Sequence, residues 1–232
     1  MTVQLVTFED EHVHDLFPVT LARPAYAMLC GSFRLIDWIE KLELSPKALV
    51  RDYLLDLQAA DYPGIEPVGR SATSKMTMWV NARLVPSRAT YRTLRGLRDQ
   101  AQPGVVRYGT SVAAAILPAS APAPPPDLHV SSLAHYFEMC GVNELHPLDV
   151  ELQLMQYPHH LVYYNQKILN DNLEYRLKKG EYQELADGVF GAEGAKIGEY
   201  TVIDTREGPI VLENKARIGP FAFLSGPAHL GA

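Results

Sequence analysis

The C-terminal part of the sequence carries aliphatic residues six positions apart, and this restricts the possible folds more than any other feature. The spacing joins Ile197 to Ile203 and, after an interruption at residues 204–209, it joins Leu212, Ile218, Leu224 and Leu230. Glycine directly follows three of these residues, as Gly198, Gly219 and Gly231. A hexapeptide period is typical of triangular parallel coils, with one aliphatic side chain per face pointing inward and small residues at the corners. The alternative is a β-meander with chance spacing, although hairpins show a period of two and paired turn signals.

This pattern predicts the start of a parallel β-helix over residues 189–232. Leu230 and Gly231 are still in register at the last residues. Stacked repeats need roughly three or more coils and a capping end to close their core. We therefore expect the β-helix to be truncated here, and its exposed edge to support a homo-oligomer.

The rest of the sequence alternates strand and helix patterns. Strand patterns occur at residues 3–8, 48–50, 76–85 and 105–117, and helix patterns occur at 32–44, with Ser32 as N-cap, and at 91–100. A proline-rich stretch at 118–127 predicts a surface loop, and residues 161–177 predict a bridging helix. We expect an α/β domain over 1–155, a linking helical segment over 156–188 and the β-helix over 189–232.

Charge and cysteine content narrow the function classes. The formal net charge of -6 provides no broad basic field for nucleic acid or anionic lipid. Cys30 and Cys140 lie far apart without a ligand spacing, which favours neither a disulfide framework nor a zinc site. The N-terminus lacks a basic, apolar leader, and no run of about 18 apolar residues occurs. We expect a soluble, cytoplasmic protein.

Five segments, in this order along the chain, carry a family resemblance: HDLFPVTLARPAYAMLCG (14–31), VRDYL (50–54), WVNARLVPS (79–87), HPLDVELQL (146–154) and GPIVLENKARI (208–218). They resemble the alternative bacterial form of the bifunctional N-acetylglucosamine-1-phosphate uridylyltransferase and glucosamine-1-phosphate acetyltransferase. The resemblance spans nearly the whole chain. It implies a reduced, Rossmann-like nucleotidyltransferase domain, a linking helix and a left-handed β-helix.

The activity that this resemblance implies joins a sugar 1-phosphate to a nucleoside triphosphate, forming a nucleotide sugar of the UDP-N-acetylglucosamine type and releasing pyrophosphate. Such transfer depends on positioning two anions and offsetting their charge. The residues expected to do this are Arg23 and Arg83 in catalysis, Arg51 and Asn81 in substrate binding, and Asp10 and Asp52 as ligands of Mg²⁺. We expect the three arginines around one cleft, because they adjoin predicted strand ends. Acetyl-CoA would serve only a full-length form.

Two departures from the wider superfamily leave an alternative open. The superfamily has a glycine-rich phosphate loop after the first strand, but no glycine occurs between Phe8 and Pro24. The superfamily also has a metal-binding aspartate in an Asn-Gly-Asp-like turn, where this chain has Asn81-Ala82-Arg83. Arg23 could pair with neighbouring carboxylates instead of phosphate, and Asn81 and Arg83 could form a solvated strand end. The alternative function is therefore a catalytically degenerate protein that binds a sugar nucleotide or scaffolds an oligomer.

Overall fold

The computed structural model describes residues 3–69 and 76–231, and the chain divides into two compact units, Met1–Val162 and Tyr163–Ala232. We call them the first and the second unit. The division lies inside the segment 156–188 that the sequence predicts as a link. None of the helices in the described part of the chain is long and apolar enough to cross a lipid bilayer.

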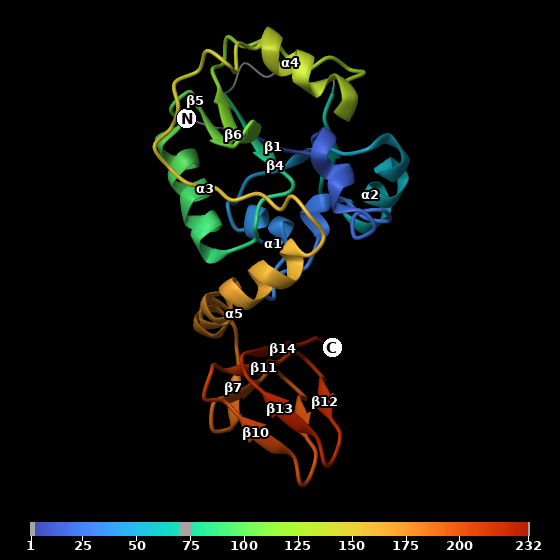
Figure 1. Ribbon diagram of the computed structural model, residues 1–232, viewed down its shortest axis with the longest axis vertical. Helices are drawn as coiled ribbons and strands as arrows, with labels where there is room; N and C mark the ends of the chain where they lie inside the picture. The colour runs from blue at the N-terminus through green and yellow to red at the C-terminus, as the bar shows by residue number, and fades with distance from the viewer. Residues whose placement is uncertain (1–2, 70–75, 232) are drawn as a thin grey trace. The chain divides into compact units, whose positions relative to one another are not determined.

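A six-stranded sheet in the order β3-β2-β1-β4-β6-β5 forms the centre of the first unit (Figure 1). Its strands are β1 (Gln4–Phe8), β2 (Lys47–Leu49), β3 (Glu66–Pro67), β4 (Thr77–Asn81), β5 (Gly104–Tyr108) and β6 (Ser111–Leu117). β1 pairs in parallel with β2 and β4, and β2 pairs in parallel with β3, whereas β6 is antiparallel to β4 and β5. This is the mixed α/β, parallel-rich and Rossmann-like class that the sequence predicted.

Helices cover both faces of this sheet. The α-helices of the chain are α1 (Leu35–Glu40), α2 (Leu55–Asp61), α3 (Arg88–Gln100), α4 (Leu133–Met139) and α5 (His160–Lys179). Short 3-10 turns are η1 (Glu11–Leu16), η2 (Ala25–Ala27), η3 (Asp52–Leu54) and η4 (Val130–Ser132). Phe137 of α4 packs edge-on against Phe8 and Trp79 of the sheet. Figure 1 shows α1 and α3 on the opposite side from α4, where Trp38 stacks on Tyr91 at 5.2 Å.

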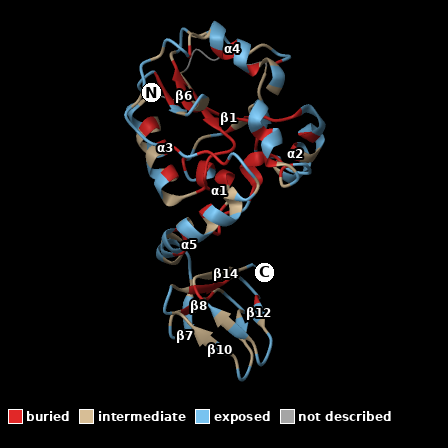
Figure 2. Cartoon of the chain, in the orientation of Figure 1, coloured by how far each residue is buried: buried red, intermediate tan, exposed pale blue. Residues whose placement is uncertain are grey.

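Buried side chains are concentrated in the central strands and in α1 (Figure 2). The two largest, Trp38 and Trp79, are both fully buried in the first unit. Because they are the only tryptophans in the sequence, tryptophan fluorescence reports on the first unit alone.

The predicted first helix starts later than the sequence indicated. Ser32 is not its N-cap, because Gly31 and Ser32 adopt left-handed backbone angles (φ 61° and 68°) that cannot begin a helix. The helix begins after Arg34, whose backbone N–H donates to Asp37 Oδ2 at 2.7 Å. The predicted strand 105–117 is in fact the hairpin of β5 and β6, which turns at Gly109 (φ 59°).

Stacked parallel strands make up most of the second unit. β8 (Val189–Gly191), β11 (Ile210–Leu212) and β14 (Ala228–Leu230) form one parallel ladder, with β7 (Gln183–Ala186) antiparallel beside β8. β9 (Lys196–Ile197) pairs with β12 (Arg217–Ile218), and β10 (Val202–Asp204) pairs with β13 (Phe223–Ser225), again in parallel. Each strand from β11 onward therefore lies beside the strand three elements earlier.

The six aliphatic residues with hexapeptide spacing share one hydrophobic cluster in this unit. The ladders place them side by side in three pairs: Ile197 with Ile218, Ile203 with Leu224, and Leu212 with Leu230. Val211, between buried Ile210 and Leu212, points the other way and packs with Leu169 and Leu173 of α5. β11 is thus buried on both faces, which explains its unbroken apolar sequence.

A polar network joins α5 to the stacked strands. One oxygen of Glu213, Oε1, accepts hydrogen bonds from Arg176 Nη1 (2.8 Å) and Tyr182 Oη (2.9 Å), and lies 2.8 Å from His229 Nε2. Burial lowers the pKa of His229 and the charge of Arg176 lowers it further, against the raising effect of the hydrogen bond to Glu213. The folded protein therefore favours neutral His229.

We predict that acidification weakens the second unit through His229. The unfolded chain takes up this proton near its ordinary pKa of about 6.5, whereas the folded chain resists it. Stability is therefore present above pH 6.5 and is lost as the pH falls below it. The measurement is thermal unfolding between pH 7.5 and 5.5, followed by circular dichroism and by tryptophan fluorescence. The transition of the second unit is the one that changes the circular dichroism and leaves the fluorescence of the first unit unchanged. The difference in the melting temperature of this transition between the native chain and His229→Gln should decrease as the pH falls. A difference that does not change with pH would contradict this prediction.

Candidate functional site

The carboxyl ends of β1, β2 and β4 meet at one edge of the sheet because these strands are parallel. Glu9 and Asp10 follow β1, and Arg51 follows β2. Asn81 ends β4, and Arg83 comes two residues later. The structure therefore brings four of the predicted site residues to the edge at which open α/β sheets bind ligands.

Arg51 lies in a buried ion pair with Glu9. Its Nε donates to Glu9 Oε2 at 3.0 Å and its backbone N–H donates to the same oxygen at 2.9 Å. Its Nη2 donates to the backbone carbonyls of Thr20 (2.7 Å) and Arg23 (3.0 Å). The Arg51 side chain is 4% exposed and that of Glu9 is 0% exposed. This pair ties β1, β2 and the loop that carries Arg23 to one another.

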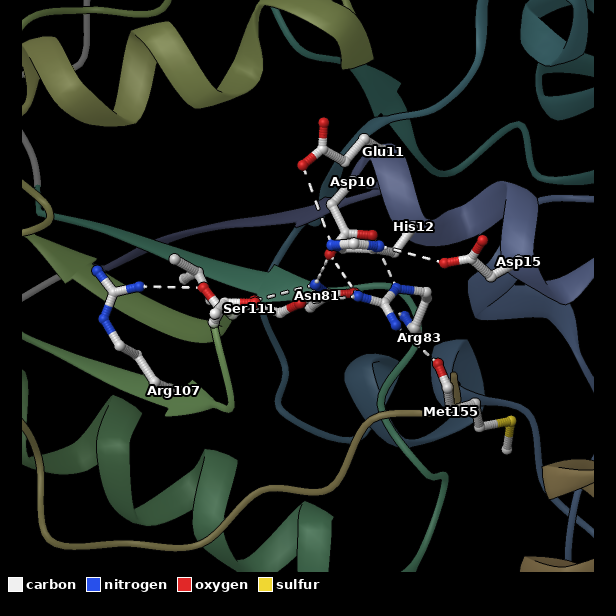
Figure 3. Close-up of polar contacts among 11 residues, drawn as sticks. Asp10, Glu11, His12, Asp15, Asn81, Arg83, Arg107, Ser111 and Met155 are labelled. Carbon is white, nitrogen blue, oxygen red and sulfur yellow. Dashed lines mark hydrogen bonds and ion pairs between the residues drawn. The ribbon is translucent and has the colours of Figure 1, made fainter. Parts of the chain in front are cut away.

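Arg83 forms a second ion pair, with Asp10 (Figure 3). Its Nε and Nη2 donate to the two carboxylate oxygens at 2.7 and 2.6 Å, a bidentate geometry. Nη1 donates to the Met155 carbonyl at 2.8 Å, and the Arg83 side chain is 1% exposed. Asn81 completes the arrangement, since its Nδ2 donates to Asp10 Oδ2 at 2.8 Å and its Oδ1 accepts the Arg83 backbone N–H at 2.9 Å.

The ion pairs of Arg51 and Arg83 affect the roles that the sequence predicts for them. Both guanidinium groups are already neutralised and are enclosed by protein, so in this arrangement they support the sheet edge and do not face a ligand. Asp10 is likewise engaged on both oxygens. Their catalytic and binding roles stay predictions from the sequence.

The other two predicted residues, Arg23 and Asp52, are exposed. In the described part of the chain no hydrogen bond or ion pair of the Arg23 guanidinium is present, so this cation is open to a ligand. Asp52 begins η3, and its Oδ1 lies 2.9 Å from His129 Nδ1. The hydrogen bond to Asp52, helped by its charge, raises the pKa of His129.

A cleft with a volume of about 260 Å³ opens at the same edge, between the segment after β1, the β5–β6 hairpin and α4. Apolar side chains supply much of its lining, namely Phe8, Val112, Val130, Leu133, Ala134, Phe137 and Val142. Polar side chains supply the rest, namely Asp10, Glu11, His12, Arg107, Thr110, Ser111, Ser131, Glu138 and Asn143. Arg23, Arg51 and Arg83 are absent from this lining.

Among the described residues, the cleft lining contains one arginine, Arg107, and no lysine. Arg107 was not among the residues that the sequence predicted for the site. Its Nη2 donates to Asn143 Oδ1 at 2.6 Å and its Nη1 donates to the Thr110 carbonyl at 3.3 Å. Arg107 is the next-to-last residue of β5 and Ser111 is the first residue of β6, so they lie on the two sides of the hairpin (Figure 3). Gly109 could have indicated a turn at this point of the sequence, because glycine within a strand pattern often marks one. The prediction of a single strand over 105–117 left this turn out.

The carboxylates of the site do not form a complete metal cage. No group of three or more histidine, cysteine, aspartate or glutamate residues that could hold a metal occurs within residues 3–69 and 76–231. Magnesium in phosphate-transferring sites needs only one or two carboxylates, because substrate phosphates and water supply the other ligands. Glu11, with its side chain 81% exposed at the cleft, is available for this role, whereas Asp10 is paired with Arg83.

Comparison with known proteins gives one family match. The family model described as sugar nucleotidyl transferase matches residues 5–180 of the chain. A search of curated proteins found no match. The matched range contains the sheet except for its first residue, Gln4, together with the paired arginines and the cleft.

We predict that Glu9 is a structural residue of the first unit. Glu9→Gln leaves the buried Arg51 without a countercharge, which should lower the free energy of unfolding by about 3–5 kcal/mol. Denaturant unfolding followed by tryptophan fluorescence measures this. The matched control is Glu11→Gln, which removes an exposed carboxylate two residues away and should change stability by about 0.5 kcal/mol or less. Equal effects of the two substitutions would show that the Glu9–Arg51 pair does not stabilise the sheet edge.

Proposed function

Since the chain belongs to the sugar nucleotidyl transferase family, we propose that it joins a sugar 1-phosphate to a nucleoside triphosphate and releases pyrophosphate. The observation that carries this proposal is the family match over residues 5–180, which includes the polar cleft at the carboxyl edge of the sheet. In the proposed reaction a phosphate oxygen of the sugar phosphate attacks the α-phosphorus. The bond between the α-phosphorus and its bridging oxygen breaks, and pyrophosphate leaves with that oxygen.

The resemblance of the five segments to the bifunctional uridylyltransferase supports a finer form of the proposal. In this form the substrates are UTP and N-acetylglucosamine 1-phosphate, and the product is UDP-N-acetylglucosamine. The two unpaired cysteines and a nucleotide substrate fit a protein that works in the cytoplasm.

The chain's own contribution is to hold two anions close together. Exposed Arg23 and Arg107, the latter in the cleft lining, would contact phosphate oxygens, because a guanidinium can bind such oxygens bidentately. The buried pairs of Arg51 and Arg83 hold the strand ends from which these loops project. Mg²⁺, when bound, would neutralise phosphate charge, with Glu11 available as a protein ligand and Asp10 and Asp52 as the ligands that the sequence suggested.

A degenerate function is the second candidate, and the Asp10–Arg83 pair favours it. An arginine occupies the turn in which the superfamily has its metal-binding aspartate, and it engages both oxygens of the nearest carboxylate. A protein of this kind would bind a sugar nucleotide or scaffold an oligomer without turnover.

We further propose that β8 to β14 are coils of a left-handed β-helix built on hexapeptide repeats. The three parallel ladders and the shared cluster of the six aliphatic residues support this proposal. In this view the chain comprises an α/β domain (1–155), a linking segment (156–188) and the β-helix (189–232). A homo-oligomer would form through the β-helix, and acetyl-CoA would serve only a longer form.

We predict that turnover, measured as pyrophosphate release from UTP and N-acetylglucosamine 1-phosphate, requires Mg²⁺. Two phosphate anions repel each other strongly at a site with exposed carboxylates when no cation neutralises them. Excess chelator should abolish the activity and added Mg²⁺ should restore it. Full activity in chelator would contradict the mechanism. Calorimetric binding of UTP with Mg²⁺ but no pyrophosphate release would instead support the degenerate candidate.

We also predict that Arg23→Ala weakens UTP binding by about tenfold to a hundredfold, because a charge-assisted hydrogen bond contributes about 1.5–3 kcal/mol. Its melting temperature should remain that of the native chain, since the Arg23 side chain is exposed. Arg95→Ala, which removes a 59% exposed arginine side chain of α3 away from the cleft, is the matched control. Loss of stability together with affinity would show that Arg23 is a structural residue.

A further inference from the structure

The cleft is too small for both substrates. Clefts that hold drug-sized ligands have volumes of about 300–1,000 Å³, whereas this one has about 260 Å³. A nucleoside triphosphate and a sugar phosphate together exceed that space. The cleft therefore receives one chemical part of the substrate pair.

The charges of the lining argue against a polyphosphate. Asp10 is neutralised by Arg83, so the remaining fixed charges are the carboxylates of Glu11 and Glu138 and the guanidinium of Arg107. A triphosphate carries about four negative charges, which a single guanidinium does not offset beside two carboxylates when no bound cation neutralises them. One guanidinium does match one phosphate group.

The remaining lining suits a ring that carries hydroxyl groups. Phe8 and Phe137 pack edge-to-face, with ring centroids 5.3 Å apart, and give the cleft an aromatic wall for the apolar faces of such a ring. Ionised carboxylates only accept hydrogen bonds, and a sugar ring in the cleft could donate hydroxyl hydrogen bonds to Glu11 and Glu138. Ser131 adds a hydroxyl that both donates and accepts.

Arg107 is held in place at this cleft. Its Nη2 and Nη1 donate to Asn143 Oδ1 and to the Thr110 carbonyl, which restrains the guanidinium plane while the residue stays exposed. A restrained, exposed guanidinium loses little conformational freedom when it binds an anion.

From this combination we propose that the cleft is the sugar-phosphate subsite. The ring lies between the aromatic wall and the carboxylates of Glu11 and Glu138, and Arg107 binds the 1-phosphate. The triphosphate binds outside the cleft. This inference rests on the proposed function for its choice of ligand, and it assigns substrate-binding roles to Arg107 and Glu138.

Calorimetric titration with single ligands tests the proposal. The probes are N-acetylglucosamine 1-phosphate, glucose 1-phosphate and Mg²⁺-UTP, each added alone to the native chain and to the variants Arg107→Met, Glu138→Gln and Glu144→Gln. Arg107→Met and Glu138→Gln should each weaken sugar 1-phosphate binding by about tenfold to a hundredfold and leave UTP affinity unchanged. Glu144→Gln, which changes an exposed carboxylate outside the cleft lining, should alter neither.

The outcomes separate this inference from the proposed function. If the two cleft variants weaken UTP binding instead, or if neither sugar 1-phosphate binds the native chain, the subsite assignment is wrong even where turnover is observed. If sugar phosphate binding depends on Arg107 and Glu138 but no pyrophosphate is released, the subsite stands and the catalytic function fails. Unchanged melting temperatures of both variants ensure that a loss of binding is local.

Discussion

The first unit depends on two consecutive carboxylates at the end of β1, each of which neutralises a buried guanidinium from another strand. Glu9 pairs with Arg51 after β2, and Asp10 pairs with Arg83 after β4. An uncompensated buried charge costs several kcal/mol, so each of these guanidinium groups requires its carboxylate partner. The Arg51 guanidinium also binds carbonyls of the loop that carries Arg23, which places that loop at the same edge.

This neutralisation determines how the edge can handle phosphate. A glycine-rich loop offers bare backbone N–H groups to a triphosphate, but the segment after β1 here has no glycine and forms η1. The buried arginines balance protein carboxylates and leave little positive charge for a ligand. Under the proposed function, phosphate charge would be offset by exposed side chains such as Arg23 and Arg107, or by a cation that arrives with the nucleotide.

The second unit follows a different rule. Short parallel strands stack so that aliphatic residues from paired strands lie side by side, as Ile197 does with Ile218. α5 covers Val211 on the outer face of β11, and Glu213 connects the helix to β14 through Arg176 and His229. Apolar burial alone would leave short strands weakly specified, and these directional hydrogen bonds add a preferred register.

The sequence by itself indicated the alternation of strands and helices in the first unit, its α/β class and the kinship to sugar nucleotidyl transferases, because these depend on local periodicity and on motifs in a fixed order. It also placed Arg51, Asn81 and Arg83 at strand ends. It missed β3, α2 and the hairpin of β5 and β6. Only the tertiary structure decided what those side chains contact. Glu9 lies 42 positions from Arg51, and Asp10 lies 73 positions from Arg83. The identity of a residue does not tell which distant charge will be nearest to it after folding. At this edge, the arginines that folding brings beside a carboxylate are buried structural residues, whereas Arg107 stays exposed.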